Sequence, residues 1–83
     1  MIQDYINEAL KIAKYEIIED DEPYYAQVDQ LKGVWASGKS FEECRNNLIE
    51  VIEGWLIIRF QRGLEIPEIN GVTIKKPQEL SIK

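Results

Sequence analysis

Hydrophobic residues recur at intervals of three and four along the first thirteen residues, which is the spacing of one face of an amphipathic helix. Asp4 lies near the start of this segment and Lys11 and Lys14 lie near its end, where the helix dipole favours them. The pattern therefore predicts a short N-terminal helix with an apolar stripe of Ile2, Ile6, Ala9, Leu10 and Ala13.

From residue 14 the pattern changes to short runs rich in aromatic and β-branched residues, which are typical of strands. Residues 14–19 and 24–28 flank the polar segment 19–23, where Pro23 lacks the N–H that a central strand needs. These two runs predict an antiparallel hairpin. A second connection over residues 29–33 leads to a third short strand over residues 34–37, which ends at Gly38.

The clearest local signal is a capping box, in which the Ser40 hydroxyl and Glu43 three residues later satisfy backbone N–H groups at a helix start. We expect this helix to continue to about Gln61, because Gly63 is a typical residue just beyond a helix end. Gly54 in its middle costs about 1 kcal/mol of helix stability relative to alanine. A glycine there indicates that another segment approaches closely.

Residues 69–74 contain the turn pair Asn70-Gly71 and predict one further short strand. The order is then α-β-β-β-α-β. With the helices on one face, this order predicts an α+β fold in which the long helix packs on a three- to four-stranded antiparallel sheet. We assign residues 1–74 to a single domain and residues 75–83, which are polar and include Pro77, to a loose C-terminal tail.

The long helix carries more apolar surface than one small sheet can cover. The stripe predicted to lie on the sheet consists of Phe41, Cys44, Leu48, Ile52 and Trp55. Another set points well away from it and consists of Ile49, Leu56, Ile57 and Phe60. Either the N-terminal helix covers this set or a second copy or another protein does, and both can hold at once. We assign these four residues to an oligomer interface.

Strand alternation divides the predicted sheet into two faces. The face toward the helix would carry Ala26, Val28, Val34 and Ala36, and the outer face would carry Tyr25, Gln27, Trp35 and Ser37. Aromatic residues with polar tips beside small polar residues resemble the composition of protein interfaces. Alternatively, Tyr25 and Trp35 simply pair with each other across the strands.

Composition narrows the possible functions. The chain has 83 residues, no histidine, one cysteine and a formal net charge of −5. It therefore has no histidine-activated nucleophile, no imidazole-bound metal and no internal disulfide. Because the phosphate backbone is negatively charged, the net negative charge of the chain disfavours direct binding to DNA or RNA. We expect a non-enzymatic protein without cofactor or metal and, in the absence of a signal peptide or membrane-spanning stretch, a cytoplasmic one.

Six acidic residues and no basic ones lie between Glu16 and Asp29. The acids at 19–22 could bind a metal ion, and Asp20, Asp21 and Asp29 could serve a residual nuclease, but the spacing matches no calcium loop. An acidic hairpin would instead attract and orient a basic partner, or simply keep the chain soluble. We assign partner binding to Asp20, Asp21, Tyr25, Gln27, Asp29 and Trp35.

The chain resembles the HicB antitoxin family over roughly residues 15–67. The resemblance rests on Tyr24-Tyr25-Ala26-Gln27-Val28, on Leu31 and Gly33, and on the segment Trp35-Ala36-Ser37-Gly38-Lys39-Ser40-Phe41-Glu42-Glu43-Cys44. It continues with Trp55-Leu56 late in the helix and with Gly63-Leu64-Glu65-Ile66-Pro67. Gln30 and Lys32 replace prolines of the family, and the N-terminal helix is additional.

This resemblance implies a degenerate RNase H-like fold and a protein that binds HicA, a small basic toxin that cleaves mRNA, and masks its active site. It also implies a homodimer or a higher homo-oligomer. Full-length members carry a C-terminal DNA-binding segment, for which residues 68–83 are too few, so we expect a compact form. The alternative is an orphan homo-oligomeric regulatory or scaffold module without a toxin partner.

Overall fold

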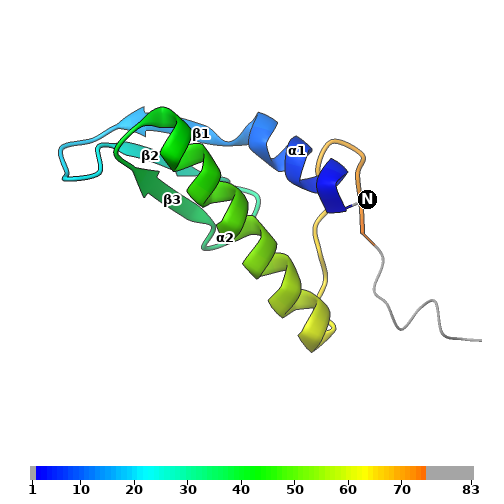
Figure 1. Ribbon diagram of the computed structural model, residues 1–83. Helices are drawn as coiled ribbons and strands as arrows, with labels where there is room; N and C mark the ends of the chain where they lie inside the picture. The colour runs from blue at the N-terminus through cyan, green and yellow to red at the C-terminus, as the bar shows by residue number, and fades with distance from the viewer. Residues whose placement is uncertain (1, 75–83) are drawn as a thin grey trace, which may run out of the picture.

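The computed structural model describes residues 2–74, so the predicted tail over residues 75–83 lies outside the described residues. The chain forms, in order, the helix α1 (Ile2–Ile12), the strands β1 (Lys14–Ile17), β2 (Tyr24–Gln27) and β3 (Trp35–Gly38), and the helix α2 (Phe41–Arg62). Figure 1 shows α2 lying across one face of the sheet, with α1 alongside. The predicted α+β class, with a three-stranded antiparallel sheet, is confirmed.

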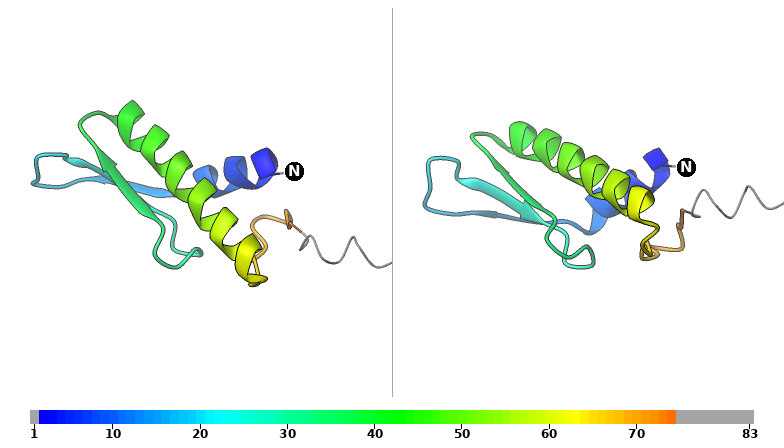
Figure 2. Two further views of the ribbon diagram at one scale, coloured as in Figure 1. Left: turned by 60° about the horizontal axis from the view of Figure 1, so that its bottom comes forward. Right: turned by 90° about the horizontal axis from the view of Figure 1, so that it is seen from below.

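The sheet has the order β1-β2-β3, and both pairs of neighbouring strands are antiparallel. The first turn is closed by the Ile18 N–H, which donates to the Pro23 carbonyl at 2.8 Å. In the middle of the sheet Ala26 lies opposite both Tyr15 and Ala36. The two buried alanines leave room for α2 to lie close to the strands, and the two views of Figure 2 show α2 on one side of the sheet only.

Both predicted ends of α2 agree with the structure. The Ser40 hydroxyl accepts a hydrogen bond from the Glu43 N–H at 3.1 Å, as expected for an N-cap. Gly63 has a left-handed φ of 65°, and its N–H donates to the Phe60 carbonyl while the Leu64 N–H donates to Arg59. These two hydrogen bonds form a Schellman C-cap, which satisfies carbonyls at the helix end that would otherwise lack partners.

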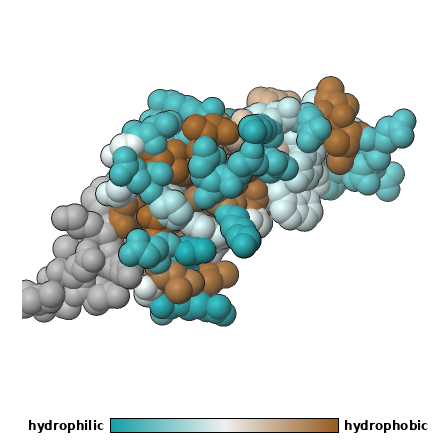
Figure 3. Space-filling model, turned by 180° about the vertical axis from the view of Figure 1, so that it is seen from behind, coloured by the Kyte–Doolittle hydropathy of each residue, from teal (hydrophilic) through white to brown (hydrophobic). Residues whose placement is uncertain are grey.

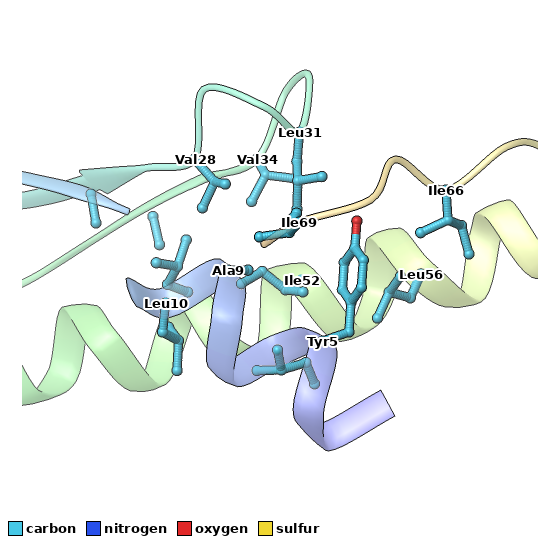
Figure 4. Close-up of a cluster of buried hydrophobic side chains, with 14 of the residues drawn as sticks. Tyr5, Ala9, Leu10, Val28, Leu31, Val34, Ile52, Leu56, Ile66 and Ile69 are labelled. Atoms are coloured by element: carbon cyan, nitrogen blue, oxygen red, sulfur yellow. The ribbon is translucent and has the colours of Figure 1, made fainter. Parts of the chain in front are cut away.

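The core lies between the sheet, α2 and the buried face of α1. Figure 4 shows Tyr5, Ala9 and Leu10 of α1 converging with Ile52 and Leu56 of α2. Tyr5 is fully buried although the predicted apolar stripe omitted it, whereas Ile2 of that stripe is 47% exposed. Phe41 also differs from its prediction: it is 51% exposed, because it stands at the first turn of α2 where the helix reaches the edge of the sheet.

The segment after α2 returns along α1 but adds no strand to the sheet within residues 64–74. Ile69 and Val72 form an isolated bridge around Asn70 and Gly71, which both have positive φ. Two positive φ values define the tight turn that such a pair favours, so the two flanking residues pair with each other. The predicted fourth strand is therefore wrong for the described residues. Instead, the Tyr5 hydroxyl donates to the Pro67 carbonyl at 2.6 Å and Asn70 donates to Glu8.

Candidate partner-binding surface

The outer face of the sheet carries the four side chains that strand alternation assigned to it. Tyr25 and Gln27 come from β2, and Trp35 and Ser37 come from β3, while Ala26 and Ala36 between them are buried under α2. Figure 3 views this side, where most of the surface near the hairpin is hydrophilic or of intermediate hydropathy. No helix covers this face within the described chain.

Tyr25 and Trp35 lie diagonally across the strand pair, and their rings stack with centroids 5.9 Å apart and an angle of 25° between planes. The expected cross-strand pairing is thus present. It leaves Trp35 54% exposed, so pairing does not bury the indole. A large aromatic side chain that is rigidly held yet exposed has the properties of an interface anchor, because little conformational entropy is lost when a partner covers it.

A row of polar contacts runs from this aromatic pair to the edge of the sheet. The Tyr25 hydroxyl donates to Gln27 Oε1 at 3.0 Å, and Gln27 Nε2 donates to Asp29 Oδ1 at 2.5 Å. Asp29 Oδ2 in turn forms an ion pair with Lys14 Nζ at 2.7 Å. Beside this row the strands and residues 28–34 enclose a shallow depression of about 280 Å³. The row fixes both the amide and the carboxylate in place.

Lys14 was not recognised as part of this surface from the sequence. It lies opposite Gln27 in the register of β1 and β2, which places it beside Asp29. Hydrogen bonds from Lys14 and Gln27 lower the pKa of Asp29, and the bond to Asp29 raises the pKa of Lys14. The charge of Asp29 is therefore balanced by Lys14. The negative charge that no basic residue balances lies at the tip of the hairpin, in the turn between β1 and β2.

Asp20 and Asp21 occupy that tip, the turn that joins β1 to β2, whereas Asp29 follows the opposite end of β2. Asp20 Oδ2 accepts a hydrogen bond from the Glu22 N–H at 3.2 Å, which shapes the turn locally. Glu22 Oε1 accepts one from the Ser37 hydroxyl at 2.6 Å, which ties the turn to the outer face of β3. The six predicted residues therefore form two groups at the two ends of one face.

This separation removes the geometric basis for a nuclease that uses Asp20, Asp21 and Asp29 together. Among residues 2–74 no group of three or more acidic or cysteine side chains is placed to hold a metal ion. Cys44 is buried, its thiol lies 3.7 Å from the Ala36 carbonyl oxygen, and burial raises the pKa of the thiol. A buried thiol whose pKa is raised is a packing residue rather than a nucleophile.

The four residues assigned to an oligomer interface differ in how far they are exposed to solvent. Leu56 is 1% exposed, because the buried face of α1 packs against it, so it is unavailable to a second copy. Ile49 and Phe60 are half-buried against the core. Ile57 is 54% exposed and points away from the sheet. The N-terminal helix thus covers part of the second apolar set but leaves Ile57 to solvent.

No helix in the described part of the chain is long and apolar enough to cross a bilayer.

A search of curated proteins returned no match. Among solved structures, the chain is similar to the crystal structure of TTHA0281 from Thermus thermophilus, with 43% sequence identity and a TM-score of 0.86. The match covers 92% of this chain and 94% of that chain.

A family model described as UPF0150-like matches residues 4–73, which includes every described helix and strand except the first two residues of α1. Because the match extends over most of its length, the chain belongs to the UPF0150-like family, a family of small HicB-related, antitoxin-like proteins.

Proposed function

We propose that this protein is a non-catalytic antitoxin that binds a small basic, HicA-like mRNA-cleaving toxin and neutralises it by covering its active site. The observation that carries the proposal is the stacked but exposed Tyr25–Trp35 pair on an uncovered sheet face, whose other end carries the acidic tip at Asp20 and Asp21. The aromatic pair supplies the apolar anchor. The acidic tip attracts a basic protein and sets its orientation.

The mechanism is steric. A toxin that acts on mRNA needs a positively charged surface for the phosphate backbone. The same surface is complementary to an acidic hairpin, so a partner docked on the outer face of the sheet would be shielded from RNA. Neither step requires a reaction on this chain.

The test begins with the neighbouring reading frame, where a basic chain of about 60–90 residues containing a histidine would be the candidate toxin, one small domain in size. Co-expression of this chain should restore growth to cells that the candidate toxin inhibits. A tagged full-length chain should also capture the candidate toxin and stop its cleavage of RNA. Trp35→Ala should weaken the complex at least about tenfold, since exposed tryptophans at interface centres are frequent hot spots. Phe41→Ala is the matched control, because Phe41 is similarly exposed but stands on the helix side.

The charge contribution has its own measurement. Reversing the tip with Asp20→Lys and Asp21→Lys should slow association and reduce its dependence on salt. Glu65→Lys with Glu68→Lys makes the same change in net charge on the C-terminal segment and should have the smaller effect. Unchanged binding by the Trp35→Ala variant, or a metal-dependent nuclease activity of the chain itself, would contradict the proposal.

A further inference from the structure

β1 forms an edge of the sheet, because the order β1-β2-β3 places a strand on only one of its sides. The Ile18 N–H donates to the Pro23 carbonyl, and these two residues lie opposite each other in the register of the hairpin. Bonded and non-bonded positions alternate along an antiparallel pair, so Glu16 also bonds with β2. The backbone N–H and C=O groups of Tyr15 and Ile17 therefore point outward from the sheet.

The other edge of the sheet differs, because α2 covers an outward backbone group there. By the same alternation the Ser37 carbonyl points outward from β3, and it accepts a hydrogen bond from Asn47 Nδ2 of α2 at 2.9 Å. Within residues 2–74, no hydrogen bond reaches the outward backbone groups of Tyr15 and Ile17. The edge of β1 is thus the one that can accept a further strand.

The side chains of Tyr15 and Ile17 belong to an apolar cluster at this edge, on the helix side of the sheet. Phe41 in the first turn of α2 places its ring centroid 5.0 Å from that of Tyr15. Phe41 nevertheless remains 51% exposed, and Ile17 is 73% exposed. An apolar cluster beside an unpaired strand is the surface that strand addition covers, since the added backbone supplies hydrogen bonds and its side chains supply apolar contacts.

Two hollows adjoin the Tyr15–Phe41 pair along β1. The smaller hollow, of about 200 Å³, is also lined by Ile17 and Tyr24 of the hairpin. The larger, of about 610 Å³, lies on the side of α1 and is also lined by Leu10. Side chains on one face of a strand are roughly 7 Å apart, so two successive ones of an added strand would fall opposite Ile17 and Tyr15, one at each hollow. Both positions favour apolar side chains.

The residue between those two positions would lie on the outer face of the sheet, opposite Glu16. Glu16 is exposed, and no hydrogen bond or ion pair of its side chain is seen within residues 2–74. The turn that follows carries only acidic charges, and these belong to Glu19, Asp20, Asp21 and Glu22. A basic side chain at the middle position of the added strand would be attracted by Glu16 and by this turn.

We propose that the edge of β1 binds an extended segment of another protein, one that carries a basic residue between two apolar residues and adds to the sheet as a fourth strand. The apolar residues would cover Ile17 and the Tyr15–Phe41 pair, and the basic residue would face Glu16. This site lies on a different part of the molecule from Trp35, so it does not rest on the proposed binding of a toxin.

Titration of the full-length chain with the acetylated and amidated peptide Lys-Val-Lys-Leu-Thr, followed by nuclear magnetic resonance, tests the strand pairing. In an antiparallel pairing Val lies opposite Ile17 and Leu lies opposite Tyr15. Exchange of the amides of these two residues of the chain should slow on binding. N-methylation of Val and Leu should weaken binding at least about tenfold, because two backbone hydrogen bonds are lost. N-methylation of the central Lys and of Thr is the matched control, since these N–H groups point away from β1, and it should weaken binding less than about threefold.

Variants of the chain test the side-chain contacts. Phe41→Ala and Ile17→Ser should each weaken peptide binding at least about fivefold through lost apolar contact, whereas Trp35→Ala should leave it unchanged. Glu16→Lys should reverse the preference, so that a peptide with Glu in place of the central Lys binds better. Glu65→Lys makes the same change in net charge elsewhere and should keep the original preference.

Equal binding by the two N-methylated peptides would overturn the proposal, because the backbone would then not pair. So would the absence of binding at millimolar peptide, or binding that Trp35→Ala abolishes. Slow exchange at Tyr15 and Ile17 in the free chain that increases with protein concentration would show that a second copy occupies this edge, and it would overturn the proposal as well.

Discussion

At the scale of single residues, Gly38 illustrates a requirement that only the folded chain shows. It ends β3, and a Cβ added there would lie 2.5 Å from the backbone N of Cys44 in the first turn of α2. Its φ is not positive, so the reason for glycine is the close approach of strand and helix rather than backbone strain. The sequence shows Gly38 as the end of a strand but gives no sign of what lies above it.

We predict that Gly38→Ala lowers the free energy of unfolding by about 1–3 kcal/mol, the usual cost of overpacking a site whose neighbours are backbone atoms. Gly54→Ala adds the same methyl group where nothing lies within 4 Å. It should raise stability by about 1 kcal/mol through helix propensity, provided that the measurement is made at a concentration where the chain is monomeric. Urea denaturation followed by tryptophan fluorescence measures both. A Gly38→Ala variant as stable as the parent would mean that α2 can shift away from β3 at no cost.

Other residue contacts were accessible from the sequence to different degrees. The outer position of Tyr25, Gln27 and Trp35 follows from a period of two, which is a property of neighbouring residues. The ion pair of Lys14 with Asp29 depends on the register between two strands, and the turn over residues 18–23 sets that register. A one-residue change in the turn would have moved Lys14 away from Asp29, so composition alone did not reveal the pair.

At the scale of elements, local signals predicted helix ends well and long-range packing poorly. Ser40 and Gly63 cap α2 because each acts on backbone groups within one turn of itself. Which side of α2 the helix α1 would cover depends on how the two helices cross, and no local pattern encodes that. For this reason Leu56 was assigned to an interface although α1 buries it. The turn pair Asn70-Gly71 likewise predicts a reversal of the chain but not its pairing partner.

The segment of residues 64–74 is attached to α1 by side-chain hydrogen bonds from the Tyr5 hydroxyl to the Pro67 carbonyl and from Asn70 to Glu8. We predict that Tyr5→Phe lowers the free energy of unfolding by about 1 kcal/mol, because the Pro67 carbonyl loses a donor while the ring still fills its site. Amide exchange over residues 64–74 should become faster than exchange in α2. Tyr15→Phe is the control, since no hydrogen bond of the Tyr15 hydroxyl is seen among the described residues, and it should change stability by less than about 0.5 kcal/mol. Equal exchange rates in the two variants would show that the hydroxyl does not hold the segment.

At the scale of the whole molecule, the charges divide into two populations. Asp20 and Asp21 at the hairpin tip are exposed, whereas Asp29 is paired with Lys14 of β1 and Glu8 accepts a hydrogen bond from Asn70. Asn70 and Lys11 lower the pKa of Glu8, just as Lys14 and Gln27 lower that of Asp29. Protonation in acid removes the attraction at the paired sites of Glu8 and Asp29.

The paired acids predict a loss of stability in acid. A carboxyl whose pKa is lowered on folding contributes fully above its unfolded pKa, near 3.8 for Asp29 and 4.5 for Glu8, and loses that contribution as the pH falls through the folded value. Asp29→Asn and Glu8→Gln should therefore reduce stability at pH 7 and flatten its decline between pH 5 and pH 2, roughly the range over which these groups titrate. At high pH the ion pair between Lys14 and Asp29 is lost by deprotonation of Lys14. Because the pKa of Lys14 is raised on folding, this loss begins only as the pH rises above the unfolded pKa of 10.5.

Urea denaturation at a series of pH values measures this decline, with Glu16→Gln as the control. Glu16 is exposed on β1, two residues after Lys14, and no hydrogen bond or ion pair of its side chain is seen in the described chain. Removing its charge should change the acid slope less than removing Asp29 or Glu8. If all three variants decline in parallel with the parent, the cross-element pairs of Asp29 and Glu8 contribute nothing to stability in acid.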